Sequence, residues 1–185
     1  MYIYAESERL YLREFTPADA ALLYDLDSDP EVMRYLTDGK TTPMEQIQKD
    51  MPRILSYADK LDHKLGIWVA HLMDTDEFIG WFLLRPDKKS PDNLKNIELG
   101  YRLKKKFWGQ GYATEMSRIL VDKAFALTTT ETVFARTHLL NVGSWSVMKK
   151  LGMTFKHEYL EDDFIGEDKR AVLYEITREQ WTNLQ

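Results

Sequence analysis

The sequence predicts a single mixed α/β (α+β) domain that spans residues 1–185. Three observations support this fold class. Apolar residues alternate at period two in several segments, they recur at helical spacing in others, and one stretch reads strand, glycine-rich turn, helix and strand in succession. The chain is long enough to bury a sizeable apolar core. A hydrophobic fraction of 44% and evenly mixed charge exclude intrinsic disorder.

The first third of the chain is predicted to be one strand followed by helices. Alternating apolar residues indicate a strand over 8–15, and the Thr-Pro pair that follows caps a helix over 17–28. A short, proline-initiated helix comes next. A third helix is predicted over 42–60, where Pro52 is expected to cause a break or a kink.

The remaining two thirds are predicted to combine six strands with two helices. Apolar runs over 65–73 and 78–85 flank turn residues and therefore form a hairpin. Glycine inside the next strand, at Gly100, marks a bulge or a close backbone approach. The other predicted elements are strands over 97–103 and 133–140, helices over 113–127 and 142–151, and final strands near 154–160 and 170–177.

Composition excludes several classes of function. The chain has no cysteine, so disulfides, thiolate zinc sites and cysteine nucleophiles are excluded, and its four histidines lack metal-ligand spacing. A net charge of -5 argues against a nucleic-acid partner. No stretch approaches the roughly 20 apolar residues that cross a bilayer, and no signal peptide is evident, so we expect a cytoplasmic protein without a membrane partner. A homodimer is left open.

The most informative segment is 97–116, in which a strand runs through Trp-Gly-Gln-Gly-Tyr-Ala into an amphipathic helix. Gly109 and Gly111 let the backbone turn tightly and approach a ligand, and the NH groups of the first helical turn attract phosphate oxygens. A diphosphate is the natural occupant. The competing interpretation is an ordinary tight turn whose glycines supply positive φ. The spacing fits neither a P-loop nor the three-glycine dinucleotide fingerprint.

A second motif lies downstream, in the run Asn-Val-Gly-Ser-Trp-Ser-Val-Met-Lys-Lys-Leu-Gly-Met-Thr-Phe over 141–155. Together the two motifs resemble the GNAT acetyltransferase superfamily, in its RimJ/RimL-like branch of ribosomal-protein N-terminal and spermidine-type enzymes. The resemblance covers nearly the whole chain. It implies a GNAT fold, with a central mixed, mostly antiparallel twisted sheet of about seven strands that splays between strands 4 and 5 and is flanked by helices. It also implies an N-acetyltransferase that moves an acetyl group from acetyl-coenzyme A directly to a primary amine.

The resemblance further implies where the coenzyme binds. The glycine turn is implied to donate backbone NH groups to the diphosphate, the strand before it to pair with pantetheine, and the residue ending the next strand to contact the coenzyme. No metal is implied. The splay leaves a slot that holds the thioester like an added strand, with NH groups available to polarise the acetyl carbonyl. The implied coenzyme-binding residues are Leu99, Gly100, Tyr101, Leu103, Gly109, Gln110, Gly111, Tyr112, Ala113, Thr114 and Asn141.

Two catalytic residues are predicted. Glu98 is the candidate general base, because alternation places it on the face opposite Ile97 and Leu99, beside the coenzyme strand, where a water could relay the proton. The alternative is an exposed strand glutamate. Ser144 is the candidate general acid, because Met148 stands where many relatives have a tyrosine. The alternative is that Ser144 caps the helix.

Several other polar residues have either a functional role or a purely structural one. His138 either faces the slot or is a packed strand histidine. The run Lys104–Lys106 either meets the 3′-phosphate or is a solvated edge. Acidic residues between Glu158 and Asp168 either attract a cationic amine or form a hydrated loop. The acceptor stays open among a protein N-terminus, a polyamine and another small amine, and the competing function is a catalytically idle acyl-coenzyme A sensor or interaction module.

Overall fold

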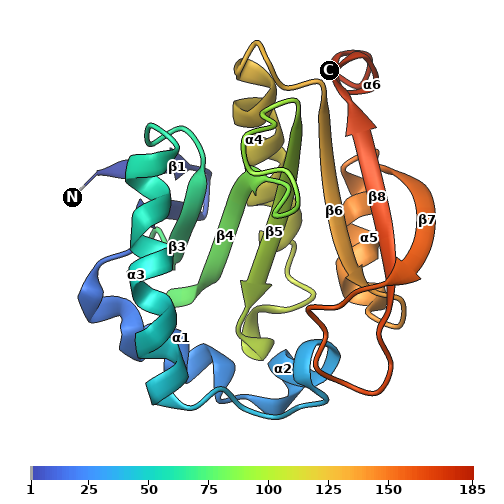
Figure 1. The fold of residues 1–185 in the computed structure, drawn as a ribbon. Coiled ribbons are helices and arrows are strands. Elements are labelled where there is room, and N and C mark those ends of the chain that lie inside the picture. The colour runs from blue at the N-terminus through green and yellow to red at the C-terminus, as the bar shows by residue number, and fades with distance from the viewer. Residues whose placement is uncertain (1) are drawn as a thin grey trace.

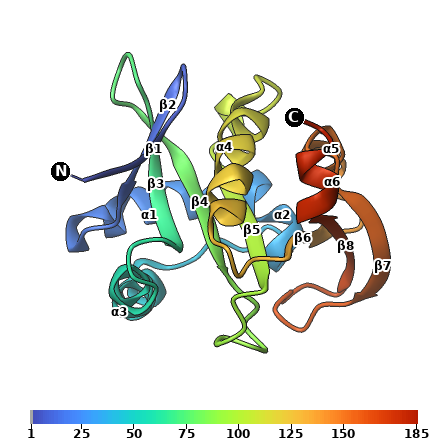
Figure 2. The ribbon, with the colours of Figure 1, turned by 90° about the horizontal axis from the view of Figure 1, so that it is seen from above.

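The computed structural model describes residues 2–185, without the side chains of residues 58–60. It consists of an eight-stranded sheet with helices on both faces (Figures 1 and 2). The helices are α1 (Ala20–Asp27), α2 (Pro30–Thr37), α3 (Met44–Lys60), α4 (Tyr112–Ala126), α5 (Val142–Lys150) and α6 (Arg178–Thr182). The strands are β1 (Ile3–Glu6), β2 (Leu10–Glu14), β3 (Gly66–Leu72), β4 (Phe78–Pro86), β5 (Asn96–Leu103), β6 (Thr132–His138), β7 (Thr154–Leu160) and β8 (Arg170–Thr177).

The sheet has the strand order β1-β2-β3-β4-β5-β6-β8-β7. All neighbouring strands are antiparallel except β5 and β6, which are parallel. The predicted mixed, mostly antiparallel sheet is therefore confirmed. It has one strand more than predicted, because the four residues of β1 are too few for a period-two pattern to stand out.

Two predictions about local structure are corrected. Helix α3 continues through Pro52, so the predicted break is wrong, while the alternative of a kink stays a prediction. Pro52 and Gln48 are both exposed, so the carbonyl that loses its NH partner faces water, which can replace the bond. Strand β5 pairs with β4 in unbroken register, so there is no bulge at Gly100 in this ladder. The glycine serves a close approach instead, because a Cβ there would lie 3.0 Å from Cγ of Leu83.

Apolar side chains fill both faces of the sheet. Helices α1 and α3 pack on one face, where Leu26 and Met51 meet Val69. Helix α4 covers the other face, where Met116 and Leu120 are fully buried. Figure 2 shows α3 and α4 on opposite sides of the strands. Burial on both sides fixes β4 and β5 in place. No helix in the described part of the chain is long and apolar enough to cross a bilayer.

The two parallel strands separate along their length. Strand β5 pairs with β6 only where residues 96–98 lie beside residues 132–134. Beyond Glu98, β5 stays paired with β4 to Leu103, and β6 stays paired with β8 to His138. Figure 1 shows β5 and β6 diverging toward the end of the sheet that carries α2. The fourth and fifth predicted strands correspond to β5 and β6, so the predicted splay is confirmed. In the described part of the chain, it leaves the facing backbone edges of β5 and β6 without a pairing strand.

Candidate active site

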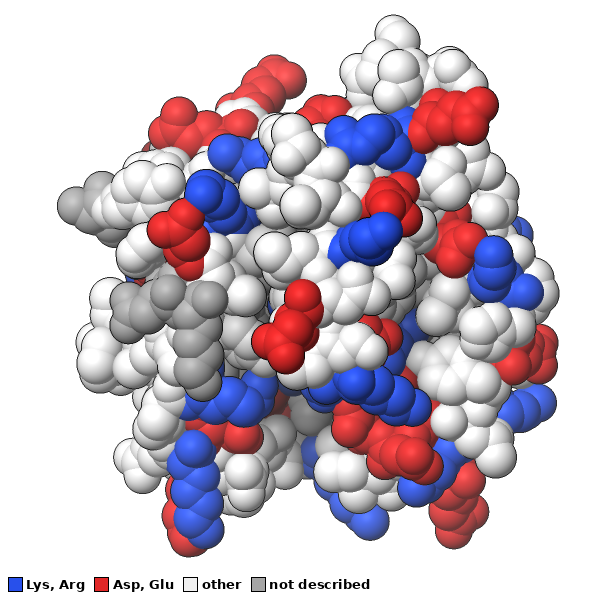
Figure 3. Space-filling view, turned by 45° about the horizontal axis from the view of Figure 1, so that its top comes forward, with Lys and Arg blue, Asp and Glu red and all other residues white. Residues whose placement is uncertain are grey.

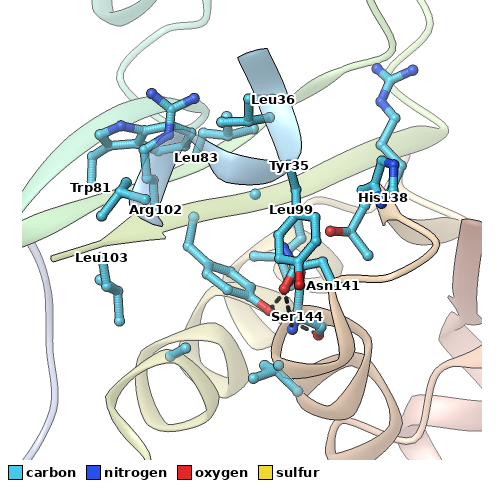
Figure 4. A pocket seen from close by; sticks show the side chains of 18 of the residues that line it. Tyr35, Leu36, Trp81, Leu83, Leu99, Arg102, Leu103, His138, Asn141 and Ser144 are labelled. Carbon is cyan, nitrogen blue, oxygen red and sulfur yellow. Dashed lines mark hydrogen bonds between the residues drawn. The ribbon is translucent and has the colours of Figure 1, made fainter. Parts of the chain in front are cut away.

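A cavity of about 940 Å³ lies where β5 and β6 separate. Its walls come from α2, α3, β4, β5, the start of α4, the end of β6 and α5 (Figure 4). The structure brings together every predicted site residue except Gln110, whose side-chain amide turns back and donates to the carbonyl of Lys106 at 2.7 Å. The predicted residues that line the cavity are Glu98, Leu99, Gly100, Tyr101, Leu103, Gly109, Gly111, Tyr112, Ala113, Thr114, Asn141 and Ser144.

The glycine turn has the geometry of an anion site. Gly109 and Gly111 have φ of 74° and 87°, the left-handed region that glycine adopts without strain. A Cβ at Gly109 would meet nothing within 4 Å, so the protein's own packing does not require a glycine there. The NH groups of residues 111–114 donate none of the hydrogen bonds found between described residues. These NH groups at a helix N-terminus are therefore available to a phosphate group.

Arg9, near the N-terminus, contacts this turn and holds it in place. Its Nη1 donates to the carbonyl of Gln110 at 3.1 Å, and its Nε donates to Glu115 at 2.7 Å. The guanidinium also lies 4.3 Å from the centre of the Tyr112 ring. The sequence analysis missed Arg9, because a contact across 101 residues leaves no local pattern.

The acidic side chains around the cavity are paired with basic ones. The three lysines before the turn each lie near a carboxylate, and their contact with the 3′-phosphate stays a prediction. In the acidic loop, Glu161 is only 5% exposed and accepts from Tyr159, while Asp163 pairs with Lys88. Asp27 pairs with Arg102 at 2.6 Å. Among the described residues, no group of three or more acidic or histidine side chains is arranged to hold a metal ion.

Glu98 is a buried carboxylate, only 6% exposed, and it is held by two arginines. Nε and Nη2 of Arg85 both lie 2.7 Å from Oε2, and Nε of Arg136 lies 2.8 Å from Oε1. Burial alone would raise the pKa of Glu98. The hydrogen bond from Arg136 and the charges of both arginines outweigh burial, so the pKa is lowered below its usual value of 4.5.

The exposed-glutamate alternative for Glu98 is therefore wrong, because the side chain lies inside the molecule. Its role as base stays a prediction. Both oxygens already accept hydrogen bonds, so a water that relays a proton must share an oxygen with a guanidinium.

His138 is not a better candidate for the base. Its Nδ1 accepts from the NH of Leu140 at 3.1 Å and its Nε2 lies 3.1 Å from the carbonyl of Asp168, so both ring nitrogens are used.

The start of α5 brings Asn141 and Ser144 together. Oδ1 of Asn141 accepts from the NH of Ser144 at 3.2 Å, so Asn141 caps the helix and the cap role considered for Ser144 is wrong. The hydroxyl of Ser144 instead lies 3.3 Å from the hydroxyl of Tyr101. Met148, one helical turn further on, is 2% exposed and carries no donor.

The loop between β7 and β8 closes one side of the cavity mouth by docking on α2. The NH of Ile165 donates to the carbonyl of Leu36 at 3.0 Å, and the NH of Glu167 donates to Asp38 at 2.9 Å. A Cβ at Gly166 would lie 2.2 Å from Oδ1 of Asp38, so a side chain there would displace the Asp38 carboxylate. The docked loop places Phe164 in the cavity wall.

The cavity combines an opening between two parallel strands, which suits an extended ligand, with a helix N-terminus that suits an anion. Residues 9–154 match the family model described as an acetyltransferase (GNAT) domain, and the chain belongs to this family. Members of the family use acetyl-coenzyme A. The chain is accordingly an N-acetyltransferase.

Individual relatives differ in their substrates. The chain is 32% identical over 181 residues to the FsC-acetyl coenzyme A-N(2)-transacetylase of Aspergillus fumigatus, across 94% of this chain and 72% of that protein. Among solved structures, RimL, a ribosomal L7/L12 alpha-N-protein acetyltransferase in complex with coenzyme A, has a TM-score of 0.77 at 15% identity, covering 95% of this chain and 98% of that one. The aminoglycoside acetyltransferase AAC(6')-Ib in complex with coenzyme A has a TM-score of 0.73 at 18% identity, covering 94% and 98%.

Replacing Glu98 tests the buried ion pair. Glu98→Gln is expected to lower the free energy of unfolding at pH 7 by about 3–5 kcal/mol, because both arginines lose their counter-charge. The folded-state pKa of Glu98 is lowered, so its stabilisation is present above the unfolded pKa and is lost as pH falls through the folded pKa. The difference from the unaltered protein should therefore shrink below about pH 4, as measured by urea unfolding.

Glu131→Gln is the matched control, because Glu131 pairs with Lys95 with both side chains more than 60% exposed. Its expected cost is about 0–1 kcal/mol. Equal costs for the two variants would contradict the account of Glu98.

Proposed function

We propose that the protein transfers an acetyl group from acetyl-coenzyme A directly to a primary amine of an acceptor molecule. One observation carries this proposal. The opening between β5 and β6 and the unpaired NH groups of residues 111–114 belong to the same cavity. A chain without cysteine has no thiol to carry the acetyl group, which supports direct transfer.

The proposed coenzyme site has two parts. The backbone of residues 109–114 holds the diphosphate, and the open space above Gly109 supports this fit. The backbone of Leu99, Gly100, Tyr101 and Leu103 on β5, with Asn141 opposite, holds the pantetheine arm. When bound, acetyl-coenzyme A supplies a thioester whose carbonyl carbon is open to attack by an amine.

We propose Glu98 as the base that receives the amine proton through a water. The carboxylate is ionised at neutral pH and can accept a proton, but its lowered pKa makes it a weaker base than a free glutamate, so its position carries this proposal. The arginines on either side keep the carboxylate at the point where β5 and β6 part.

We further propose that the acceptor is a small-molecule amine whose body carries little positive charge. The acidic side chains around the cavity have arginine or lysine partners, so a polycation finds little unbalanced negative charge there. On the face in Figure 3 acidic and basic side chains are interspersed. The loop docked on α2 narrows the mouth, which also favours a small molecule.

Gly109→Asn tests the coenzyme site. Among residues other than glycine, asparagine tolerates the left-handed conformation best, so the fold should survive with a melting temperature within a few degrees of the unaltered protein. The new side chain occupies the proposed diphosphate space. The Kd for acetyl-coenzyme A should rise at least about tenfold in calorimetric titration. Unchanged affinity in a folded variant would remove the turn from the site.

Release of free thiol from acetyl-coenzyme A, followed with a panel of amines, tests the activity and the acceptor class. Monoamines with uncharged bodies, such as amino-acid amides, should give kcat/KM no lower than polyamines and aminoglycosides, because the balanced charges around the cavity do not concentrate polycations. The rates with monoamines should change little with salt. Preference for polyamines would contradict the acceptor class, and no thiol release with any amine would contradict the activity.

Glu98→Gln also tests the proposed base. Turnover per folded molecule should fall by ~10² to 10⁴-fold, the usual value of a positioned general base. Arg85→Gln is the matched control, because it breaks the same buried pair while leaving the carboxylate in place. It should cost stability but retain most of the turnover. Equal losses of turnover in both variants would assign Glu98 a structural role only.

A further inference from the structure

The guanidinium of Arg9 contacts the start of α4 through all three of its nitrogens. Nε donates to Oε2 of Glu115 at 2.7 Å, and Nη2 lies 2.5 Å from the same oxygen. The backbone NH of Arg9 donates to Oε1 of Glu115 at 3.1 Å. The carboxylate thus holds the guanidinium in one orientation. In that orientation Nη1 donates to the carbonyl of Gln110 at 3.1 Å.

The hydrogen bond to Gln110 fixes the direction of the next backbone NH. The described part of the chain contains no cis peptide bond, and the C=O and N–H of one trans peptide point in opposite directions. Because the carbonyl of Gln110 faces Arg9, the NH of Gly111 faces away from Arg9. Gly111 lines the cavity, whereas Arg9 is not among the residues that line it. This places the NH of Gly111 on the cavity side of the turn.

The glycines of the turn do not hold this peptide plane by themselves. Gly109 and Gly111 have φ of 74° and 87°, and glycine adopts conformations with negative φ about as readily. Among the hydrogen bonds between described residues, the one from Arg9 is the one that the carbonyl of Gln110 accepts. Without this bond, the peptide between Gln110 and Gly111 can rotate and turn its NH away from the cavity.

We propose that Arg9 is a positioning residue that orients the peptide between Gln110 and Gly111, so that the NH of Gly111 is directed at the diphosphate of the coenzyme. This inference rests on the proposed function. Arg9 acts through the backbone and does not itself touch the phosphates. An NH that is already directed at its ligand needs no reorganisation on binding, so Arg9 favours the whole coenzyme over a shorter thioester without a diphosphate.

Arg9→Met tests this role, because methionine keeps an apolar stem and removes every side-chain donor. The Kd for coenzyme A should rise at least about tenfold in calorimetric titration, the value of a hydrogen bond to a charged group. The KM for acetyl-coenzyme A should rise with kcat unchanged, since the diphosphate is held equally before and during the reaction.

Acetyl-pantetheine, which lacks the diphosphate, separates positioning from general support of the fold. Its kcat/KM with Arg9→Met should equal that of the unaltered protein, because the oriented NH has no phosphate to meet. An equal loss of kcat/KM with both thioesters would assign Arg9 a structural role only and overturn the proposal.

Arg9→Lys separates orientation from charge. Lysine keeps a positive charge beside Glu115, but its single ammonium lacks the planar fork that contacts Glu115 and Gln110 together. The Kd for coenzyme A should therefore rise as it does in Arg9→Met. A lysine variant that binds coenzyme A as tightly as the unaltered protein would overturn the proposal, because charge alone, at the phosphates or beside Glu115, would then account for the effect of Arg9.

Arg13→Met is the matched control. Arg13 lies in β2, and its guanidinium likewise donates to a backbone carbonyl, that of Glu14 at 3.1 Å, and to a carboxylate, that of Asp19 at 2.8 Å. It is not among the residues that line the cavity. Its loss should lower the melting temperature and leave the Kd for coenzyme A unchanged.

The amide proton of Gly111 gives a direct readout by nuclear magnetic resonance in isotope-labelled protein. Coenzyme A should shift this proton downfield in the unaltered protein and shift it less in both Arg9 variants. If Arg9→Met does not fold, Arg9→Lys carries the test, because it keeps the charge beside Glu115. Variants that bind coenzyme A with unchanged Kd overturn the role of Arg9 and leave the proposed function standing. Failure of the unaltered protein to bind coenzyme A overturns both.

Discussion

Strands β5 and β6 stop pairing after Glu98 and Phe134, and every feature of the cavity depends on this early end of the ladder. Unpaired backbone groups inside a protein are costly, so a sheet seldom opens without something to occupy the gap. Here β4 and β8 pair with the other sides of β5 and β6 as far as Leu103 and His138. The opening therefore lies between two strands that are each held by a neighbour, and its edges suit an extended ligand that pairs as a strand would.

The buried ion pairs of Glu98 lie at the position where this ladder ends. Arg85 reaches the carboxylate from β4 and Arg136 reaches it from β6, so side chains continue the link between three strands after the backbone bonds have stopped. A buried carboxylate without partners would be expensive, and two guanidinium groups remove that cost. The same arrangement keeps a negative charge beside the opening at neutral pH.

The sequence predicted what depends on local patterns, which included seven of the eight strands, the glycine turn and the splay that the family resemblance implied. It did not predict which side chains contact each other across the fold. Arg136 is 38 residues from Glu98, and Ser144 is 43 residues from Tyr101, so neither contact leaves a trace in spacing. Alternation placed Glu98 on the correct strand but gave no information on burial, because the arginines that make burial tolerable come from other strands. Coenzyme contacts and catalytic roles remain predictions.

The β7–β8 loop docks on α2, so the mouth of the cavity is built from segments other than those of the proposed coenzyme site. The two parts can therefore change independently in evolution. The contacts that shape the mouth involve Asp38 and Gly166, which lie on segments that contribute nothing to the glycine turn. A side chain at Gly166 would push the loop away from α2 and widen the entrance without touching β5 or the start of α4. Under the proposed function, changes in these two surface segments can alter the entrance for the acceptor while the proposed coenzyme site stays fixed.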